Sequence, residues 1–315
     1  MSLVLAVGLF GLGLVLVIGS AEQLVESTVG LSHQLGLSAF LISMVFIGFD
    51  PENLAVGAVA SYDQTAGIAL GTIVGAAMVA LALAFGVTAL VVPLEFGQVP
   101  PQMLLLPVGA VLLLLGLAVD GLLSRMDGVL LLLGYAGAVW GLVRWERRGL
   151  RVAPTEAVEE EVEEEAPSGL GWSVLWFVAS LVGVLLGSEL LLRGARPIIA
   201  ALGWTDTLFG MTLLALLVSV EEVARELPAA LKGRPDVSYG NVVGSALAFF
   251  CFNAGVIALV RPVPVDTITR TFYLPVCAGT VVLIAVLMAR HRVPRWGGGL
   301  LLLAYLLFVL GPWLW

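Results

Sequence analysis

Long apolar segments separated by short polar ones run along the whole chain. Each apolar segment has about 20 residues or more, which is enough for a helix to cross a hydrocarbon core about 30 Å thick. A water-soluble fold has no core that could bury so many of them. The pattern predicts ten membrane-spanning helices, at about residues 2–20, 35–60, 66–93, 103–123, 128–145, 170–192, 197–231, 238–261, 271–290 and 296–314.

The pattern occurs twice, with an offset of 169 or 170 residues. The segment SRMDGVLLLLGYAGAVWG near the end of the first half resembles PRWGGGLLLLAYLLFVLG near the end of the second. Glu52 and Glu222 are 170 residues apart, and the glycine pairs that begin at Gly71 and Gly240 are 169 apart. Five spans per half is an odd number, so the halves must cross the membrane in opposite directions. We therefore predict an all-α polytopic membrane protein made of two inverted five-helix repeats.

The two predicted repeats, residues 1–146 and 170–315, are joined by the hydrophilic linker 147–169. Seven glutamates lie between Glu156 and Glu165 in this linker, so it cannot bury a core, and we expect it to be solvated. With the N-terminus outside, the inner loops hold nine Arg and Lys residues and the outer loops five. The positive-inside rule then places both termini outside the cell and the linker in the cytoplasm.

Composition agrees with the membrane interpretation and limits the chemistry. Hydrophobic residues make up 60% of the chain and charged ones 12%, against about 25% charged in a typical soluble domain. Cys251 and Cys277 are too few for a disulfide framework or a zinc site, and His33 and His291 lie near the ends of spans. No nucleophile–base pair or metal-binding histidine motif is present. We expect no enzyme activity, no bound cofactor and no nucleic-acid partner.

Polar residues in the middle of apolar spans are the candidates for function, because charged groups are costly at the bilayer centre. The second span contains IGFDPEN, with Asp50, Pro51, Glu52 and Asn53. Proline removes a backbone donor, so the helix should kink or break there and leave carbonyl groups free beside two carboxylates. Such oxygen ligands suit hard cations such as sodium or calcium.

The seventh span contains the counterpart LLVSVEEVAREL. Ser219 lies three residues before Glu222, so we expect the two on one helical face. Glu221 is a further candidate ligand, although an ion pair with Arg225 is an alternative role for it. Glycines at four-residue spacing let helices approach closely. The segments GTIVGAA and GNVVGSA are therefore expected to bring three more oxygen donors near the glutamates, namely Thr72, Asn241 and Ser245.

These motifs resemble those of the cation/calcium exchanger superfamily, which includes the sodium/calcium exchangers. Each half of its members carries a motif like G-T-S-x-P-E, followed by G-N-x-x-G-S-N-x-x-N. The residues Pro51–Asn53 look like the first glutamate motif, and Ser219–Ser245 looks like the corresponding region of the second half. The resemblance covers nearly all ten segments. It implies a ten-helix inverted-repeat fold, with Glu52 and Glu222 as central ion ligands and the two serines as further oxygen donors.

The chain departs from these motifs where the second one ends. Ala80 and Phe249 stand where the family has an amide or carboxylate side chain. Asn253, one helical turn beyond Phe249, is a candidate to compensate, with helix–helix hydrogen bonding as the alternative role.

The resemblance implies a secondary active antiporter that exchanges calcium for sodium or protons by alternating access around two midplane glutamates. The alternative function is a non-transporting or altered-specificity cation-binding paralogue, such as a sensor or a transporter of another cation. We expect a monomeric, multi-pass protein of the plasma membrane, whose partners are the lipid bilayer and inorganic cations.

Overall fold

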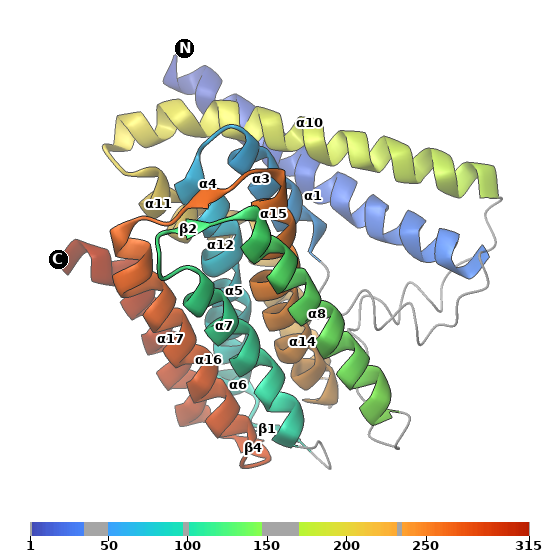
Figure 1. Cartoon of the computed structure of the whole chain (residues 1–315), viewed down its shortest axis with the longest axis vertical. Helices are drawn as coiled ribbons and strands as arrows, with labels where there is room; N and C mark the ends of the chain where they lie inside the picture. The colour runs from blue at the N-terminus through green and yellow to red at the C-terminus, as the bar shows by residue number, and fades with distance from the viewer. Residues whose placement is uncertain (1, 35–49, 97–100, 147–169, 232–234, 315) are drawn as a thin grey trace.

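The structure, a computed structural model, describes residues 2–34, 50–96, 101–146, 170–231 and 235–314 (Figure 1). The first half consists of α1 (Leu3–Gln34), α3 (Pro51–Tyr62), α4 (Ala66–Leu70), α5 (Ala76–Met78), α6 (Phe85–Val91), α7 (Leu105–Leu117) and α8 (Arg125–Glu146). The second consists of α10 (Leu170–Leu202), α11 (Asp206–Phe209), α12 (Ala215–Val218), α13 (Val220–Leu231), α14 (Pro235–Leu247), α15 (Ala254–Val260), α16 (Leu274–Met288) and α17 (Arg295–Leu310). The predicted linker 147–169 lies outside the described residues.

Short π-helical turns connect several of these helices into continuous rods. They are η1 (Gly71–Gly75), η2 (Val79–Ala84), η4 (Gly210–Leu214), η5 (Ala248–Asn253) and η6 (Thr269–Tyr273). The turns η3 (Pro101–Leu104) and η7 (Gly311–Leu314) are 3₁₀-helical. Because a π turn widens the helix and shifts the side chains that follow it, such turns are frequent at functional sites.

Seven helical segments of the described chain are long and apolar enough to cross a membrane. The bent pair Asp206–Val218 and Val220–Pro228 makes an eighth if it is one span, and Gln102–Leu117 is a shorter apolar helix. The predicted span 35–60 is described only from residue 50 onward. The membrane class is therefore supported by the helices themselves, while the count of ten stays a prediction.

The predicted boundary between the sixth and seventh spans, at residues 192–197, is wrong. α10 continues through Pro197 and ends at Leu202. In a membrane helix an interior proline is tolerated when its surroundings satisfy the freed backbone groups. Gly203, which directly follows the last residue of the helix, has a φ of +67°. The Trp204 amide donates to the Ile199 carbonyl oxygen, as in a glycine-terminated helix cap.

The elements of the two halves recur with the offset seen in the sequence. The helices α8 and α17 begin 170 residues apart, at Arg125 and Arg295. The strand β1 (Leu94–Glu95) pairs with β4 (Arg292–Val293), and β2 (Leu122–Leu123) pairs with β3 (Val263–Pro264), both antiparallel. Each strand thus pairs with the non-equivalent strand of the other half.

Two helix crossings follow the same exchange. α6 packs on α17 and α15 packs on α8. A methyl group added at Gly298 would lie 2.6 Å from the Gly86 carbonyl oxygen, and one added at Gly128 would lie 2.8 Å from that of Gly255. Only glycine allows backbones to approach so closely, so these residues hold the halves together at two equivalent places.

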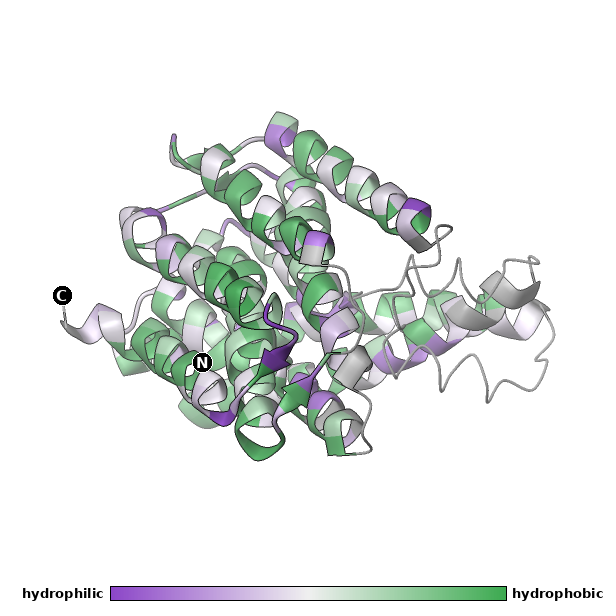
Figure 2. Ribbon diagram, turned by 90° about the horizontal axis from the view of Figure 1, so that it is seen from below, coloured by the Kyte–Doolittle hydropathy of each residue, from purple (hydrophilic) through white to green (hydrophobic). Residues whose placement is uncertain are grey.

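The long helices α1 and α10 lie side by side and extend away from the remaining helices (Figure 1). They too cross at glycine, because a methyl group at Gly194 would lie 2.5 Å from the Phe10 amide nitrogen. Both helices keep large exposed apolar side chains, such as Val15 and Leu186. Hydrophobic residues dominate the ribbon of the whole molecule (Figure 2). Exposed apolar faces on helices of this length are what lipid contact requires.

The segments 66–91 and 238–260 form the centre of the fold. In their most apolar stretches 94% and 83% of the residues are buried, against 22% in α1 and 28% in α10. The predicted glycine-rich motifs therefore lie on the innermost helices. The short helices α3 and α13 pack against these central segments and carry the candidate glutamates.

Candidate cation site

The first candidate glutamate lies at the start of α3. Pro51 is the first residue of that helix, and Asp50 is its N-cap. The Asn53 backbone amide donates to Asp50 Oδ1, and the Asn53 Nδ2 atom donates to Asp50 Oδ2, both at 2.8 Å. Glu52 is therefore held in the first turn of the helix and is only 2% exposed. The prediction of a helix break at Pro51 agrees with this start, and the carboxylate of Asp50 has a capping role.

The second candidate glutamate occupies the equivalent place in α13. Ser219 separates α12 from α13, with φ −109° and ψ 18°, so the rod breaks there without a proline. Glu222 follows in the first turn of α13 and is 7% exposed. Ser219 therefore lies in the break itself, and only Glu222 lies within α13. The Glu222 amide still donates to the Ser219 carbonyl oxygen, at 3.2 Å.

A hydrogen bond between the two breaks joins the halves. The Asn53 Nδ2 atom donates to Ser219 Oγ at 2.9 Å, and both side chains are buried. Glu52 precedes this asparagine directly, and Glu222 is three residues beyond this serine. We infer that both carboxylates belong to one buried polar region. The N-terminal ends of α3 and α13 face this region with their positive helix dipoles, which favours negative charge there.

Asn241 connects three further polar side chains on the side of the second half. Its Nδ2 atom donates to Glu226 Oε2 at 2.5 Å and lies 3.5 Å from Glu222 Oε2. Ser245 Oγ donates to Asn241 Oδ1 at 3.3 Å. The structure thus places Asn241 beside Glu222, and Ser245 beside Asn241. It also adds Glu226, four residues after Glu222, whose buried side chain the sequence places on the same helical face.

Thr72 and Glu221 are the remaining predicted ligands. The Thr72 hydroxyl donates to the Ala69 carbonyl oxygen of its own rod at 2.9 Å, and it lies against Gly57 of α3. Thr72 therefore reaches α3, one helical turn from Asn53. Glu221 is half-buried, and the predicted pairing with Arg225 falls on a side chain outside the described ones.

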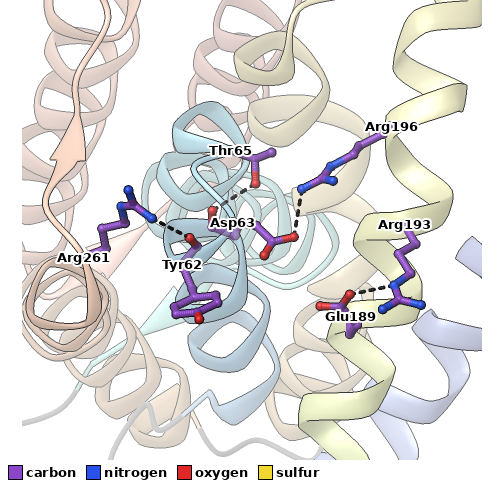
Figure 3. A network of polar contacts seen from close by, with 8 residues as sticks. Tyr62, Asp63, Thr65, Glu189, Arg193, Arg196 and Arg261 are labelled. Carbon is purple, nitrogen blue, oxygen red and sulfur yellow. Dashed lines mark hydrogen bonds and ion pairs between the residues drawn. The ribbon is translucent and has the colours of Figure 1, made fainter.

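Charged contacts fix α3 at its other end (Figure 3). Arg196 of α10 forms an ion pair with Asp63 across 2.8 Å. Arg261, at the end of α15, donates to the Tyr62 carbonyl oxygen at 3.0 Å. Both contacts join α3 of the first half to helices of the second half, α10 and α15.

No three His, Cys, Asp or Glu side chains converge on a possible metal position within the described part of the chain. A cation held here would therefore need neutral oxygens as well as carboxylates. The region supplies the amides Asn53 and Asn241 and the hydroxyls of Ser219 and Ser245. Mixed carboxylate, amide and hydroxyl oxygens suit a hard cation.

The chain is similar over almost its full length to proteins of one transporter family. The family described as sodium/calcium exchanger protein matches residues 5–144 and 172–314. A putative antiporter, CaxA, of Alkalimonas amylolytica is 29% identical over 307 residues, which cover 93% of this chain and 94% of that one. The sodium/calcium exchanger MaX1 of Methanosarcina acetivorans is 24% identical over 334 residues, covering 95% of each chain.

Solved structures show the same likeness. A structure of the sodium-calcium exchanger NCX_Mj, soaked without sodium and calcium, is 26% identical and has a TM-score of 0.60. The match covers 99% of this chain and 100% of that one. Another structure of NCX_Mj, soaked with sodium and strontium, gives a TM-score of 0.61.

Proposed function

Since the chain belongs to the sodium/calcium exchanger protein family, we propose that it is a secondary active antiporter that exchanges calcium for sodium or protons. Cation antiport is the activity of the family. Relatives that match this chain include a sodium/calcium exchanger and a calcium/proton antiporter of Bacillus subtilis. The choice of calcium as cargo and the two candidate coupling ions rest on these relatives and on the oxygen donors of the site.

In the proposed mechanism Glu52 and Glu222 bind the cation together, one from each half. The hydrogen bond between Asn53 and Ser219 is the observation that carries this proposal, because it joins the two glutamate-bearing segments inside the protein. Two carboxylates neutralise one calcium ion, and the same pair accommodates monovalent competitors. Asn241 and Ser245 orient or complete the ligand set on the side of α13, and Asp50 and Thr72 act mainly by holding α3.

The two halves act as inverted repeats in this proposal. Alternating access then needs one helix group to rock against another around a fixed site. The two-fold pattern of strand pairs and glycine crossings supports such a relation between the halves. Both termini lie outside the cell and the acidic linker lies in the cytoplasm, as the distribution of arginine and lysine favours.

Calcium flux in proteoliposomes tests this function. The purified chain is reconstituted, loaded with calcium, and exposed in turn to an inward sodium gradient and an inward proton gradient. We expect calcium release that depends on one of the two gradients and stops when the gradient is dissipated. An absence of calcium flux under both gradients would refute the calcium assignment.

A non-transporting cation-binding protein is the second candidate function. Ala80 and Phe249, both buried, stand where the family motif carries oxygen donors. Cation binding by the purified chain without gradient-dependent flux would favour this candidate over the antiporter.

A further inference from the structure

The helices α3 and α15 run in parallel, and the contacts between them define their register. A Cβ atom added at Gly57 would collide with the side chain of Ile257. Four residues further along α3, Ser61 Oγ donates to the carbonyl oxygens of Ile257 and Arg261, at 3.2 and 2.9 Å. Gly57 therefore lies level with Ile257, and Ser61 lies level with Arg261.

One turn back along both helices, this register places Asn53 level with Asn253. Asn253 ends η5, which packs against α3, η1 and α5. Its side chain is fully buried, and neither its Oδ1 nor its Nδ2 has a hydrogen-bond partner among the described residues. Asn53 Oδ1 is likewise buried without a partner in this part of the chain. Buried amides without partners are unfavourable, so they call for a ligand or a water molecule.

The positions that correspond to these two amides in the repeat carry no amides. The π turns η2 and η5 correspond with an offset of 169 residues, so Ala84 is the equivalent of Asn253. The glutamates correspond with an offset of 170, so Val223 is the equivalent of Asn53. Ala84 thus ends the π turn η2 at the place where Asn253 ends η5. The amide at residue 253 is therefore not required by the helix geometry.

We propose that Asn253 is a further ligand of the cation site, which it completes together with Asn53 Oδ1 on the side of α3. This inference rests on the proposed function and extends it to a residue that lies outside the glutamate segments. Amide oxygens are neutral, so they add ligands for a hard cation without adding charge to those of Glu52 and Glu222. The result is an asymmetric site, with amides on the α3 side and the Glu226–Asn241 pair on the α13 side.

The test compares wild type with Asn253→Leu, Asn253→Ala and Asn253→Asp by following the melting temperature of the detergent-purified protein against calcium and sodium concentration. Ser180→Ala is the matched control, because Ser180 is also buried without a described partner but lies in α10. We expect Asn253→Leu and Asn253→Ala to fold with a cation-free melting temperature at or above that of wild type. Both should need about tenfold more calcium for the half-maximal shift. Asn253→Asp, which keeps an oxygen ligand at this position, should retain calcium binding. Ser180→Ala should match wild type.

The opposite pattern overturns the inference. A lower cation-free melting temperature in Asn253→Ala, with an unchanged half-maximal calcium concentration, would assign Asn253 to packing or to a structural water molecule. Because the readout is binding and not transport, this result leaves the proposed antiport intact. A wild-type protein without any cation-dependent shift or flux would instead overturn the proposed function, and the inference with it.

Discussion

The Nδ2 atom of Asn53 lies 2.9 Å from Ser219 Oγ, although 166 residues separate the two along the chain. This hydrogen bond connects the first turn of α3 with the break before α13. It is buried, and it joins the segments that carry Glu52 and Glu222. The account of a shared cation site depends on this connection.

Removing this connection should destabilise the protein. Asn53→Ala keeps the backbone amide that donates to Asp50 Oδ1, but it removes the side-chain donor to Asp50 Oδ2 and to the Ser219 hydroxyl, at a cost of about 1–3 kcal/mol. Combined with Ser219→Ala, it should show a coupling energy of about 0.5–3 kcal/mol in reversible unfolding. Ser188→Ala is the control, because that hydroxyl donates only to Val184 of its own helix. Strictly additive effects of the two substitutions would mean that the hydrogen bond contributes nothing.

Two adjacent glycines of α17 should respond very differently to alanine. At Gly298 the new methyl group would meet the Gly86 carbonyl oxygen and the Leu90 amide nitrogen at 2.6 Å, so α17 and α6 must separate. We expect a loss of about 1–3 kcal/mol. At Gly299 nothing lies within 4 Å, and the substitution should be neutral or stabilising by up to about 1 kcal/mol. The melting temperatures of the two variants in detergent compare them directly, and equal values would contradict the packing described for α6 and α17.

The ion pair between Arg196 and Asp63 should contribute little to stability. Its side chains are 52% and 24% exposed, so water and salt screen the attraction. A double-mutant cycle with Arg196→Gln and Asp63→Asn should give about 1 kcal/mol or less. That value should fall further when the ionic strength is raised. A coupling of several kcal/mol that persists in high salt would show that this end of α3 is more rigidly held than its exposure implies.

Local signals and the repeat made much of the fold predictable. Pro51 predicts the start of α3, and the offset of 170 predicts that α8 and α17 begin at equivalent residues, Arg125 and Arg295. The family resemblance is confirmed by the match over both halves. The roles of the individual site residues stay predictions.

Other features depend on contacts that no local pattern contains. The break at Ser219 has no proline or glycine, and it lies where a partner from the other half, Asn53, bonds the serine side chain. Pro197 has the opposite character, because it is a helix breaker inside a helix that continues to Leu202. In both places tertiary packing outweighs the local preference of the residue. Glu226 could have been found from its spacing of four residues from Glu222.

The central claim, that one cation is shared by a glutamate from each half, is tested most directly by calcium-binding stoichiometry and affinity. Wild type is compared with Glu52→Gln, Glu222→Gln and the double variant in detergent, with Glu189→Gln, a partly exposed carboxylate of α10, as the control. If both carboxylates ligate one ion, each single substitution should weaken calcium binding by about 100-fold or more, and the double variant should lose little beyond that. Single variants that each keep half of the bound calcium at wild-type affinity, with losses that add in the double variant, would contradict the shared site.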